Sequence, residues 1–270
     1  MLYFSYNLKN KPNFYKASIN LNQALFKENI HYEFLEIESI WLRDFMPVIT
    51  KSGKYISFRY EPSYLENEND LNAERADREH PFLPNLVFSN INLDGGNVVF
   101  SPLKEKAIIS SRVFDENPEY EKDALVKKLE NLLEAKIIII PSLKSDMTGH
   151  ADGMARFVDG NTCVVNESAS PHGLESKIKK VLQNNNIKTI DFPYFETNDK
   201  SSDGVKSAIG CYINYLETDS VIFLPIFGCK TDKKALNLAK QIFDKKVVGV
   251  NINEIALHGG LLNCISWNDA

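Results

Sequence analysis

The stretch Gly149-His150-Ala151-Asp152 is followed by an apolar run at 155–158, a polar turn at 159–161 and a second apolar run at 163–165. Turn residues between runs of β-branched and aromatic side chains are typical of a β-hairpin. In an extended stretch, residues i and i+2 point to the same face, so His150 and Asp152 are expected to face the same side. The stretch therefore predicts a hairpin that begins with an imidazole and a carboxylate, although a loop histidine beside a solvated aspartate would give the same pattern.

Four further polar signatures recur along the chain. They are Trp41-Leu42-Arg43-Asp44, Leu93-Asp94-Gly95-Gly96-Asn97, Tyr212-Ile213-Asn214-Tyr215 and Gly259-Gly260-Leu261-Leu262-Asn263-Cys264. The steps from Asp44 to Asp94, Asp152, Asn214 and Cys264 are 50, 58, 62 and 50 residues. A period of roughly 50 residues indicates a repeated supersecondary unit, as in propellers and related arrays.

The segments between the signatures repeat one order of elements. Hairpins are predicted at 47–58, 97–109, 155–165 and 212–224, and leucine spacing predicts helices at 119–133, 175–184 and 233–244. A short apolar strand follows each helix, at 136–140, 189–192 and 246–250. The pattern predicts an α/β fold and a single domain over residues 1–270, with the polar segment 61–84 as an insertion and candidate lid.

Composition limits the classes of partner. A net charge of −5 argues against nucleic acid and for a cationic small molecule. Residues 1–14 do not resemble a signal peptide, and the apolar run 137–140 is too short to span a membrane. The four cysteines, Cys163, Cys211, Cys229 and Cys264, form no C-x-x-C pair, so no metal site is predicted and a reducing cytoplasmic compartment fits best.

Each signature has an ordinary structural explanation when it is taken alone. Asp44 could pair with Arg43, Asp94 could precede a glycine turn, Asn214 could be a strand residue, and Cys264 could be a buried inert thiol. Their common period argues against five separate explanations. If the units are arranged around an axis, a thiol, an imidazole and carboxylates converge, which is a nucleophilic catalytic site.

From Trp41 to its end, the chain resembles the guanidine-modifying (pentein) superfamily, and within it the agmatine deiminase and bacterial peptidylarginine deiminase group. The family pattern W-x-R-D-x-G-P is similar to residues 41–47, its acidic-Gly-Gly element to 93–97, and its G-H-x-D to 149–152, with Arg156-Phe157 after it. Its Y-x-N-F is similar to 212–215, and its Gly-rich element ending in the nucleophile to 259–264. The resemblance implies an α/β propeller of about five ββαβ-type modules around a pseudo-fivefold axis.

The resemblance also implies residue roles and a reaction. Cys264 would attack the guanidinium carbon, Asp44 and Asp152 would accept its N–H groups, His150 would act as general acid and then base, and Asp94 would orient His150. Carboxylates match the fork of donors on a guanidinium. Asn214, Trp41 and Arg43 would complete substrate binding. The implied activity is a deiminase that releases ammonia from agmatine or an arginine derivative, without metal or cofactor.

Some questions stay open from the sequence. The same covalent intermediate would serve an amidinotransferase, and a non-catalytic guanidinium-binding protein could share the fold, although it would not need the thiol. Met46 and Leu261 stand where the family has glycine and are expected to reshape the pocket. The expected partner is a cationic guanidino molecule or a peptidyl arginine, with no nucleic acid and no membrane, and the options include a homo-oligomer. Arg59 could grip a substrate carboxylate or lie on the surface.

Overall fold

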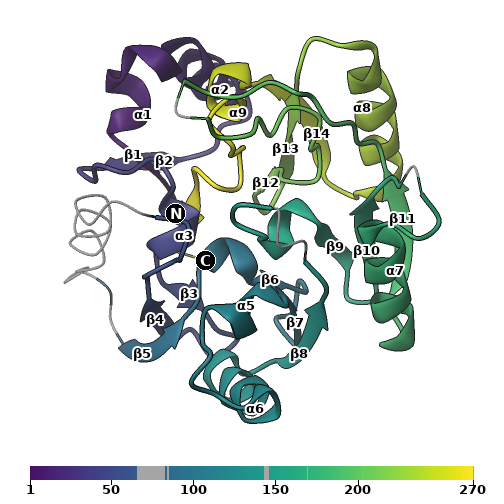
Figure 1. Ribbon diagram of the computed structural model, residues 1–270. Coiled ribbons are helices and arrows are strands. Elements are labelled where there is room, and N and C mark those ends of the chain that lie inside the picture. Colours follow the sequence, from purple (N-terminus) through teal and green to yellow (C-terminus); the bar gives the residue numbers. More distant parts are fainter. Residues whose placement is uncertain (66–82, 84, 143–145, 169, 203, 270) are drawn as a thin grey trace. The chain divides into compact units, whose positions relative to one another are not determined.

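The computed structural model describes residues 1–65, 83, 85–142, 146–168, 170–202 and 204–269 (Figure 1). The chain divides into two compact units, Met1–Leu42 with Asp191–Ala270, and Arg43–Ile190. Helices and strands alternate along both units, as the α/β prediction requires. The single-domain prediction and the propeller arrangement stay predictions.

Within the described residues, the strands form five three-stranded sheets of one design. The middle strand pairs antiparallel with one neighbour in every sheet. In four sheets the third strand is parallel to the middle one. The strand orders are β3-β4-β5, β6-β7-β8, β11-β10-β9, β12-β13-β14 and β15-β1-β2. A period of about 50 residues therefore does correspond to one structural unit, which we call a module.

The unit Arg43–Ile190 contains three of the modules. Its elements, some of which reach just past its ends, are α3 (Leu42–Phe45), β3 (Val48–Ile49), β4 (Tyr55–Arg59), β5 (Leu86–Asn92), the 3₁₀ turn η2 (Gly95–Asn97), β6 (Val99–Phe100), β7 (Lys106–Ser110), α5 (Arg112–Asp115), α6 (Lys122–Leu133), β8 (Lys136–Ile140), the 3₁₀ turn η3 (Ala151–Gly153), β9 (Ala155–Asp159), β10 (Thr162–Asn166), α7 (Leu174–Asn184) and β11 (Lys188–Phe192).

The other unit contains two modules, one of which joins the two ends of the chain. Its elements are β1 (Leu2–Ser5), α1 (Asn7–Asn10), η1 (Pro12–Phe14), α2 (Tyr15–Lys27), β2 (Tyr32–Leu35), β12 (Leu216–Glu217), β13 (Val221–Ile226), α8 (Lys230–Ile242), β14 (Lys246–Asn251), α9 (Asn253–Ala256) and β15 (Trp267–Asn268). Leu2 pairs with Asn268 and Tyr3 with Trp267, so β15 and β1 form the antiparallel pair of this module. The sequence prediction did not include this arrangement, because its two strands lie at opposite ends of the chain.

The isoleucine run at 137–140 is apolar on both sides because helices cover both faces of its sheet. On one face, Ile108, Ile138 and Ile140 pack with Ile178 and Leu182 of α7. On the other face, Ala107, Ile109 and Ile137 pack with Leu125, Leu129 and Leu133 of α6. A strand buried on both faces is a continuous apolar run. Each buried isoleucine or leucine contributes about 2 kcal/mol, so this sheet anchors its unit.

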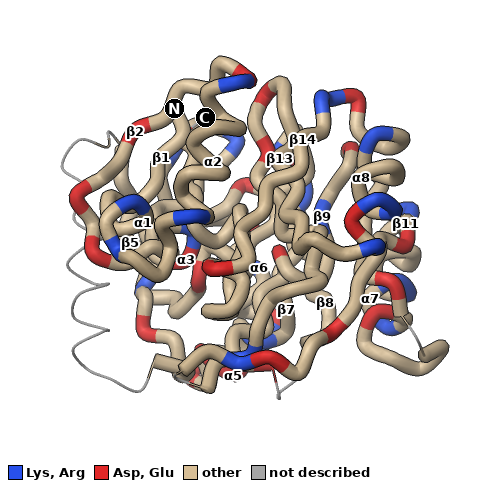
Figure 2. The backbone as a smooth tube through the Cα atoms, turned by 90° about the horizontal axis from the view of Figure 1, so that it is seen from above, with Lys and Arg blue, Asp and Glu red and all other residues tan. Residues whose placement is uncertain are grey.

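The predicted helices at 119–133, 175–184 and 233–244 are confirmed as α6, α7 and α8 with shifts of up to three residues at their ends. The predicted strands at 136–140, 189–192 and 246–250 are confirmed as β8, β11 and β14. Helices α7 and α8 each contain residues of both charge signs (Figure 2). Within the described residues, no helix has both the length and the apolar character needed to cross a bilayer.

Two strand predictions were wrong at their first residues, and one stretch expected to be extended forms a turn. Strand β12 begins only at Leu216, after a turn at 212–214, and β6 begins only at Val99, after the 3₁₀ turn Gly95–Asn97. Asp152 lies in the 3₁₀ turn Ala151–Gly153, closed by a bond from Met154 N to Ala151 O at 2.9 Å, so the extended spacing assumed for His150 and Asp152 is also wrong. In all three cases the signature forms a turn that precedes the hairpin.

Candidate active site

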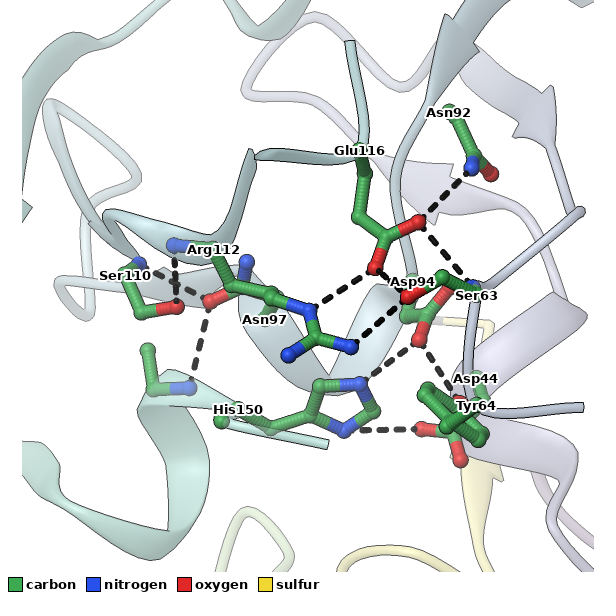
Figure 3. Close-up of polar contacts among 12 residues, drawn as sticks. Asp44, Ser63, Tyr64, Asn92, Asp94, Asn97, Ser110, Arg112, Glu116 and His150 are labelled. Carbon is green, nitrogen blue, oxygen red and sulfur yellow. Dashed lines mark hydrogen bonds and ion pairs between the residues drawn. The ribbon is translucent and has the colours of Figure 1, made fainter. Parts of the chain in front are cut away.

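His150 lies between two carboxylates in the unit Arg43–Ile190 (Figure 3). Its Nε2 is 2.7 Å from Asp94 Oδ2, and its Nδ1 is 3.5 Å from Asp44 Oδ1. The three side chains are 7–11% exposed. Because both ring nitrogens face carboxylate oxygens, the arrangement favours a doubly protonated imidazole.

Two short turns position these side chains. Asp94 is the residue before the 3₁₀ turn Gly95–Asn97, and His150 is the residue before the 3₁₀ turn Ala151–Gly153. Asn97 links them, because its Oδ1 accepts hydrogen bonds from Ser110 N at 2.8 Å and from Ala151 N at 3.2 Å. The buried Asn97 side chain therefore ties the Asp94 turn to the His150 turn and to β7.

Burial and neighbouring charges together raise the pKa values of both Asp44 and His150. Burial raises the pKa of Asp44, and the charges of Asp94 and Asp152 raise it further, to about 7, although His150 opposes the shift. Burial acts to lower the pKa of His150, but the charges of Asp44, Asp94 and Asp152 and the hydrogen bond to Asp94 outweigh it. The net result raises the pKa of His150 to about 10.

Asp44 has unused capacity to accept hydrogen bonds. Its Oδ1 is buried and accepts no hydrogen bond from any described residue. An anionic oxygen removed from water without a donor is costly, so it favours either a proton or a cationic donor. Asp152, 2% exposed, adds a third carboxylate to the cluster, and its charge acts on both Asp44 and His150. The cluster can therefore accept N–H groups from a cation and can supply a proton from His150.

Gly96 allows this close packing. A Cβ atom at this position would lie 2.6 Å from His150 Nδ1 and 2.7 Å from Asp44 Oδ1. Both distances are shorter than real Cβ contacts, so any side chain here must push the imidazole and the carboxylate apart. Position 96 therefore requires glycine, because the His150 and Asp44 side chains leave no room for a Cβ atom.

Gly96→Ala is expected to lower the free energy of unfolding by about 1–3 kcal/mol, the usual effect of overpacking a filled site. Urea unfolding measures it. Gly160→Ala is the matched control, because a Cβ there meets nothing within 4 Å. Equal stability of the two variants would contradict the steric argument.

A second cluster lies in the other unit. Cys264 Sγ is 3.4 Å from Asn214 Oδ1, and the same amide oxygen accepts a hydrogen bond from Asn263 N at 3.2 Å. The Gly-rich turn before the cysteine is packed against Trp41, because a Cβ at Gly260 would lie 2.1 Å from the indole ring. Within this unit, Trp41, Asn214 and the Gly-rich turn at 259–264 therefore lie together.

Nearly the whole chain matches one family model. The model of Porphyromonas-type peptidyl-arginine deiminase matches residues 11–269. The chain belongs to this family. The match begins at residue 11, about 30 residues before Trp41, where the sequence motifs begin. The family resemblance therefore also covers α2 and β2, which belong to the module that joins the two ends of the chain.

Relatives and solved structures support the family. A curated protein of Enterococcus faecalis named "Putative agmatine deiminase" is 26% identical over 213 residues, covering 68% of this chain and 57% of that protein. One of Lactococcus lactis with the same name is 25% identical and covers 77% of this chain and 63% of that protein. The chain thus spans little more than half the length of these curated relatives.

Among solved structures, agmatine deiminase of C. jejuni has a TM-score of 0.78 at 18% identity, covering 99% of this chain and 92% of that chain. Agmatine deiminase of Enterococcus faecalis has a TM-score of 0.75 at 18% identity and covers 98% of this chain and 92% of that chain. At this level of identity the likeness shows the fold, which is the α/β fold of these proteins.

The predicted site residues of this family member fall into two groups. Asp44, Asp94, His150 and Asp152 gather in one unit, whereas Trp41, Asn214 and Cys264 gather in the other. Arg43 follows Trp41 at the start of the first group, where its charge acts to lower the pKa of Asp44. The contact between Asp94 and His150 has the geometry expected for an orienting carboxylate; the catalytic roles themselves stay predictions.

Sequence reasoning missed residues that support His150 and Asp94. Tyr64 donates a hydrogen bond to Asp94, and Asn97 links the two turns. Arg112 and Glu116 form an ion pair at 2.8 Å and line a small cavity of about 10 Å³ beside His150. Tyr64 has no signature and precedes a polar segment, so only the fold could reveal it. Asn97 is part of the signature at 93–97, and its position directly after two glycines could have indicated a turn that an asparagine side chain stabilises.

The departures from the family pattern are apolar packing residues. Met46 is 3% exposed and Leu261 is 1% exposed, so both are in the core of their own unit. Arg59 is partly exposed and pairs with Glu61 at 3.9 Å and Glu119 at 3.5 Å, which favours a surface role. Most of the candidate lid at 61–84, namely 66–82 and 84, lies outside the described residues.

Proposed function

We propose that this chain is a deiminase that hydrolyses a guanidino compound to a ureido compound and ammonia. The observation that carries the proposal is the pairing of a buried His150 with Asp94 and with an Asp44 oxygen that lacks a hydrogen-bond donor among the described residues. A planar guanidinium supplies both the positive charge and the N–H groups that such a carboxylate accepts. Agmatine is the first substrate to test, because several relatives and fold neighbours carry its name.

The proposed mechanism uses both clusters in one reaction, with the modules arranged as a propeller. The Cys264 thiolate forms a bond to the guanidinium carbon, and Asp44 and Asp152 hold its N–H groups. His150 gives a proton to the departing nitrogen, the C–N bond breaks and ammonia leaves. His150 then takes a proton from water, the water oxygen bonds to the same carbon, and the C–S bond breaks to restore the thiolate. Water therefore supplies the product oxygen, and the enzyme is unchanged.

The raised pKa of His150 suits the first half of this reaction. A pKa of about 10 keeps the imidazole protonated near neutral pH, ready to act as an acid. Asn214 would hold the Cys264 thiol through the contact at 3.4 Å, and Trp41 would support the turn that carries it. The proposal needs no metal or cofactor. We propose a reducing, cytoplasmic location, because none of the four cysteines forms a disulfide among the described residues.

The deciding experiment measures ammonia release from agmatine, arginine, methylated arginines and peptides with C-terminal or internal arginine. We expect release from one class of compound. Product analysis with an added amine separates the alternative, because an amidinotransferase would release the amine part of its substrate in place of ammonia and would form a new guanidine on the added amine. Binding of a guanidine without turnover would instead leave a guanidinium-binding protein.

The pH dependence of kcat/KM is expected to be bell-shaped. Burial raises the pKa of Asp44 to about 7, so the carboxyl group is neutral below this pH and accepts a cation less well. The rate should therefore rise as pH increases through about 7. It should fall above about 10, where His150 loses the proton that it donates. Initial rates between pH 5.5 and 10.5 check this.

The surface variant Glu196→Gln is the control for this profile, because Glu196 pairs only with exposed groups in the contacts described, Lys206 at 2.8 Å and Tyr194 at 3.2 Å. Its profile should match that of the unmodified protein. A rate that is level from pH 6 to pH 9 would show that Asp44 does not titrate in the working range.

A further inference from the structure

Tyr64 contacts the carboxylate that holds His150. Its hydroxyl donates a hydrogen bond to Asp94 Oδ2 at 2.7 Å, and His150 Nε2 is 2.7 Å from the same oxygen (Figure 3). The tyrosine ring also packs edge-on against the imidazole, with ring centroids 6.1 Å apart. We propose that Tyr64 is a positioning residue, which fixes Asp94 and, through it, the orientation of His150. The inference rests on the proposed function.

The backbone around Tyr64 is anchored on both sides of Pro62. Glu61 N donates to Asn92 Oδ1 at 2.9 Å, and Glu61 O accepts from Asn92 Nδ2 at 2.7 Å. Ser63 then bonds to Glu116 twice, from its backbone N at 3.0 Å and from its hydroxyl at 2.7 Å. These bonds deliver the tyrosine to Asp94 in a defined position.

Arg112 completes this anchor. It forms an ion pair with Glu116 at 2.8 Å and donates a hydrogen bond to Ser63 Oγ at 2.8 Å (Figure 3). The arginine is the first residue of α5, two positions after the end of β7, and Asn97 ties that strand to the His150 turn. The support under Tyr64 and the support under His150 therefore come from the same part of the fold, which holds the phenol beside the imidazole.

Tyr64 acts as a hydrogen-bond donor and does not transfer its own proton. Burial raises the pKa of Tyr64 well above its ordinary value, and the negative charge of Asp94 raises it further. The hydroxyl therefore stays protonated throughout the working pH range. Its role is to hold the oxygen of Asp94 in place and to share its negative charge.

The two bonds to Asp94 Oδ2 compete, which gives the sign of the expected effect. When His150 is neutral, Asp94 is the stronger acceptor and bonds more strongly to Tyr64. Tyr64 therefore favours neutral imidazole and restrains the rise in the His150 pKa that the carboxylates cause. A restrained pKa helps a histidine that must act as an acid and then as a base. The titratable and charged groups that face His150 are Asp44, Asp94, Asp152 and Tyr64, with Arg112 and Glu116 along the adjoining cavity.

Tyr64→Phe tests the proposal, because it keeps the ring and removes only the hydroxyl. We expect kcat to fall about tenfold, as for loss of a hydrogen bond to a charged group, with KM changed less than about twofold. We also expect the pKa of His150 to rise by about half a unit. Imidazole ¹⁵N NMR between pH 6 and 11 measures that pKa, with the His150 signal assigned by its absence in His150→Gln protein.

Tyr194→Phe is the matched control, because it removes a hydroxyl that bonds to the surface carboxylate of Glu196 at 3.2 Å. It should leave kcat and the His150 pKa unchanged. Ser63→Ala is a second test, since it loosens the anchor and keeps the phenol; it should shift both quantities in the same direction as Tyr64→Phe, by less.

An unchanged His150 pKa in both Tyr64→Phe and Ser63→Ala overturns the proposal, whatever the activity. An equal loss of kcat in Tyr194→Phe also overturns it, because a general effect on stability would then explain the result. The NMR titration does not depend on turnover. If the unmodified protein releases no ammonia from any guanidine but the pKa shift occurs, the proposed function fails while the link from Tyr64 to His150 stands.

Discussion

Cys264→Ala protein is expected to release ammonia at least a thousandfold more slowly than the unmodified protein, on the order of the loss seen when a catalytic nucleophile is removed. The other site groups can bind and orient a guanidinium, but none of them can replace the thiolate as the atom that attacks carbon. Binding should therefore persist while turnover is lost. Ammonia release measures turnover, and calorimetric titration with the same guanidine measures binding.

Cys229→Ser is the matched control for this experiment. Cys229 is exposed, belongs to the same unit as Cys264 and caps α8, a role that serine can keep. It should retain full activity. Mass spectrometry of acid-quenched enzyme adds an independent check, because a covalent intermediate must appear on the peptide that contains Cys264. Substantial turnover by Cys264→Ala protein would rule out the covalent mechanism and leave direct attack by water.

The sequence predicted the modules well where their strands and helices are set by local patterns. The leucines of α6 and the isoleucines of β8 pack against each other in one core. The helical spacing of the leucines and the apolar run of the isoleucines are therefore both consequences of burial in that core. The antiparallel pair β9–β10 was predicted from its turn residues for the same reason, since the pairing is local along the chain. Local sequence signals and tertiary packing agree in these elements.

The elements that sequence reasoning missed depend on distant partners or on turns. Strand β1 pairs with β15, more than 260 residues away in the chain, and no local pattern records that pairing. The residues at 95–97 and 151–153 form 3₁₀ turns, whereas a strand was expected to begin at 97 and an extended chain was expected at 150–152. Such turns place a side chain at a particular point in space, so they occur where the site is built.

The candidate site shows the same division. Asp44, Asp94, His150 and Asp152 could be found because polar residues recur at one point of each module, and the structure brings these four together. Tyr64 could not be found this way, because it reaches Asp94 from outside the repeat pattern. Residues that hold site residues in place can come from any segment that lies near the site, so they do not recur at a regular spacing in the sequence.

Asp44→Asn is expected to have effects of opposite sign on activity and stability. Removing the charge that accepts the guanidinium should lower kcat/KM by about a hundredfold to a thousandfold, because a charge-assisted bidentate contact is lost. The same change should stabilise the folded protein, because the ionised Asp44 is buried and its Oδ1 has no donor among the described residues. Steady-state kinetics and urea unfolding measure the two effects on one sample.

The pH dependence of that stability difference identifies its cause. Burial raises the folded pKa of Asp44 from 3.8 to about 7, so the folded protein retains a proton that the unfolded chain has lost. Stability from this group is therefore full below about pH 4 and declines as pH rises to about 7. The amide that replaces the carboxyl group cannot ionise, so the advantage of Asp44→Asn should grow over that interval by on the order of 4 kcal/mol. An advantage independent of pH would mean that packing, and not charge, explains it; growth with pH would mean that the protein keeps a destabilising carboxylate because a cationic substrate needs it.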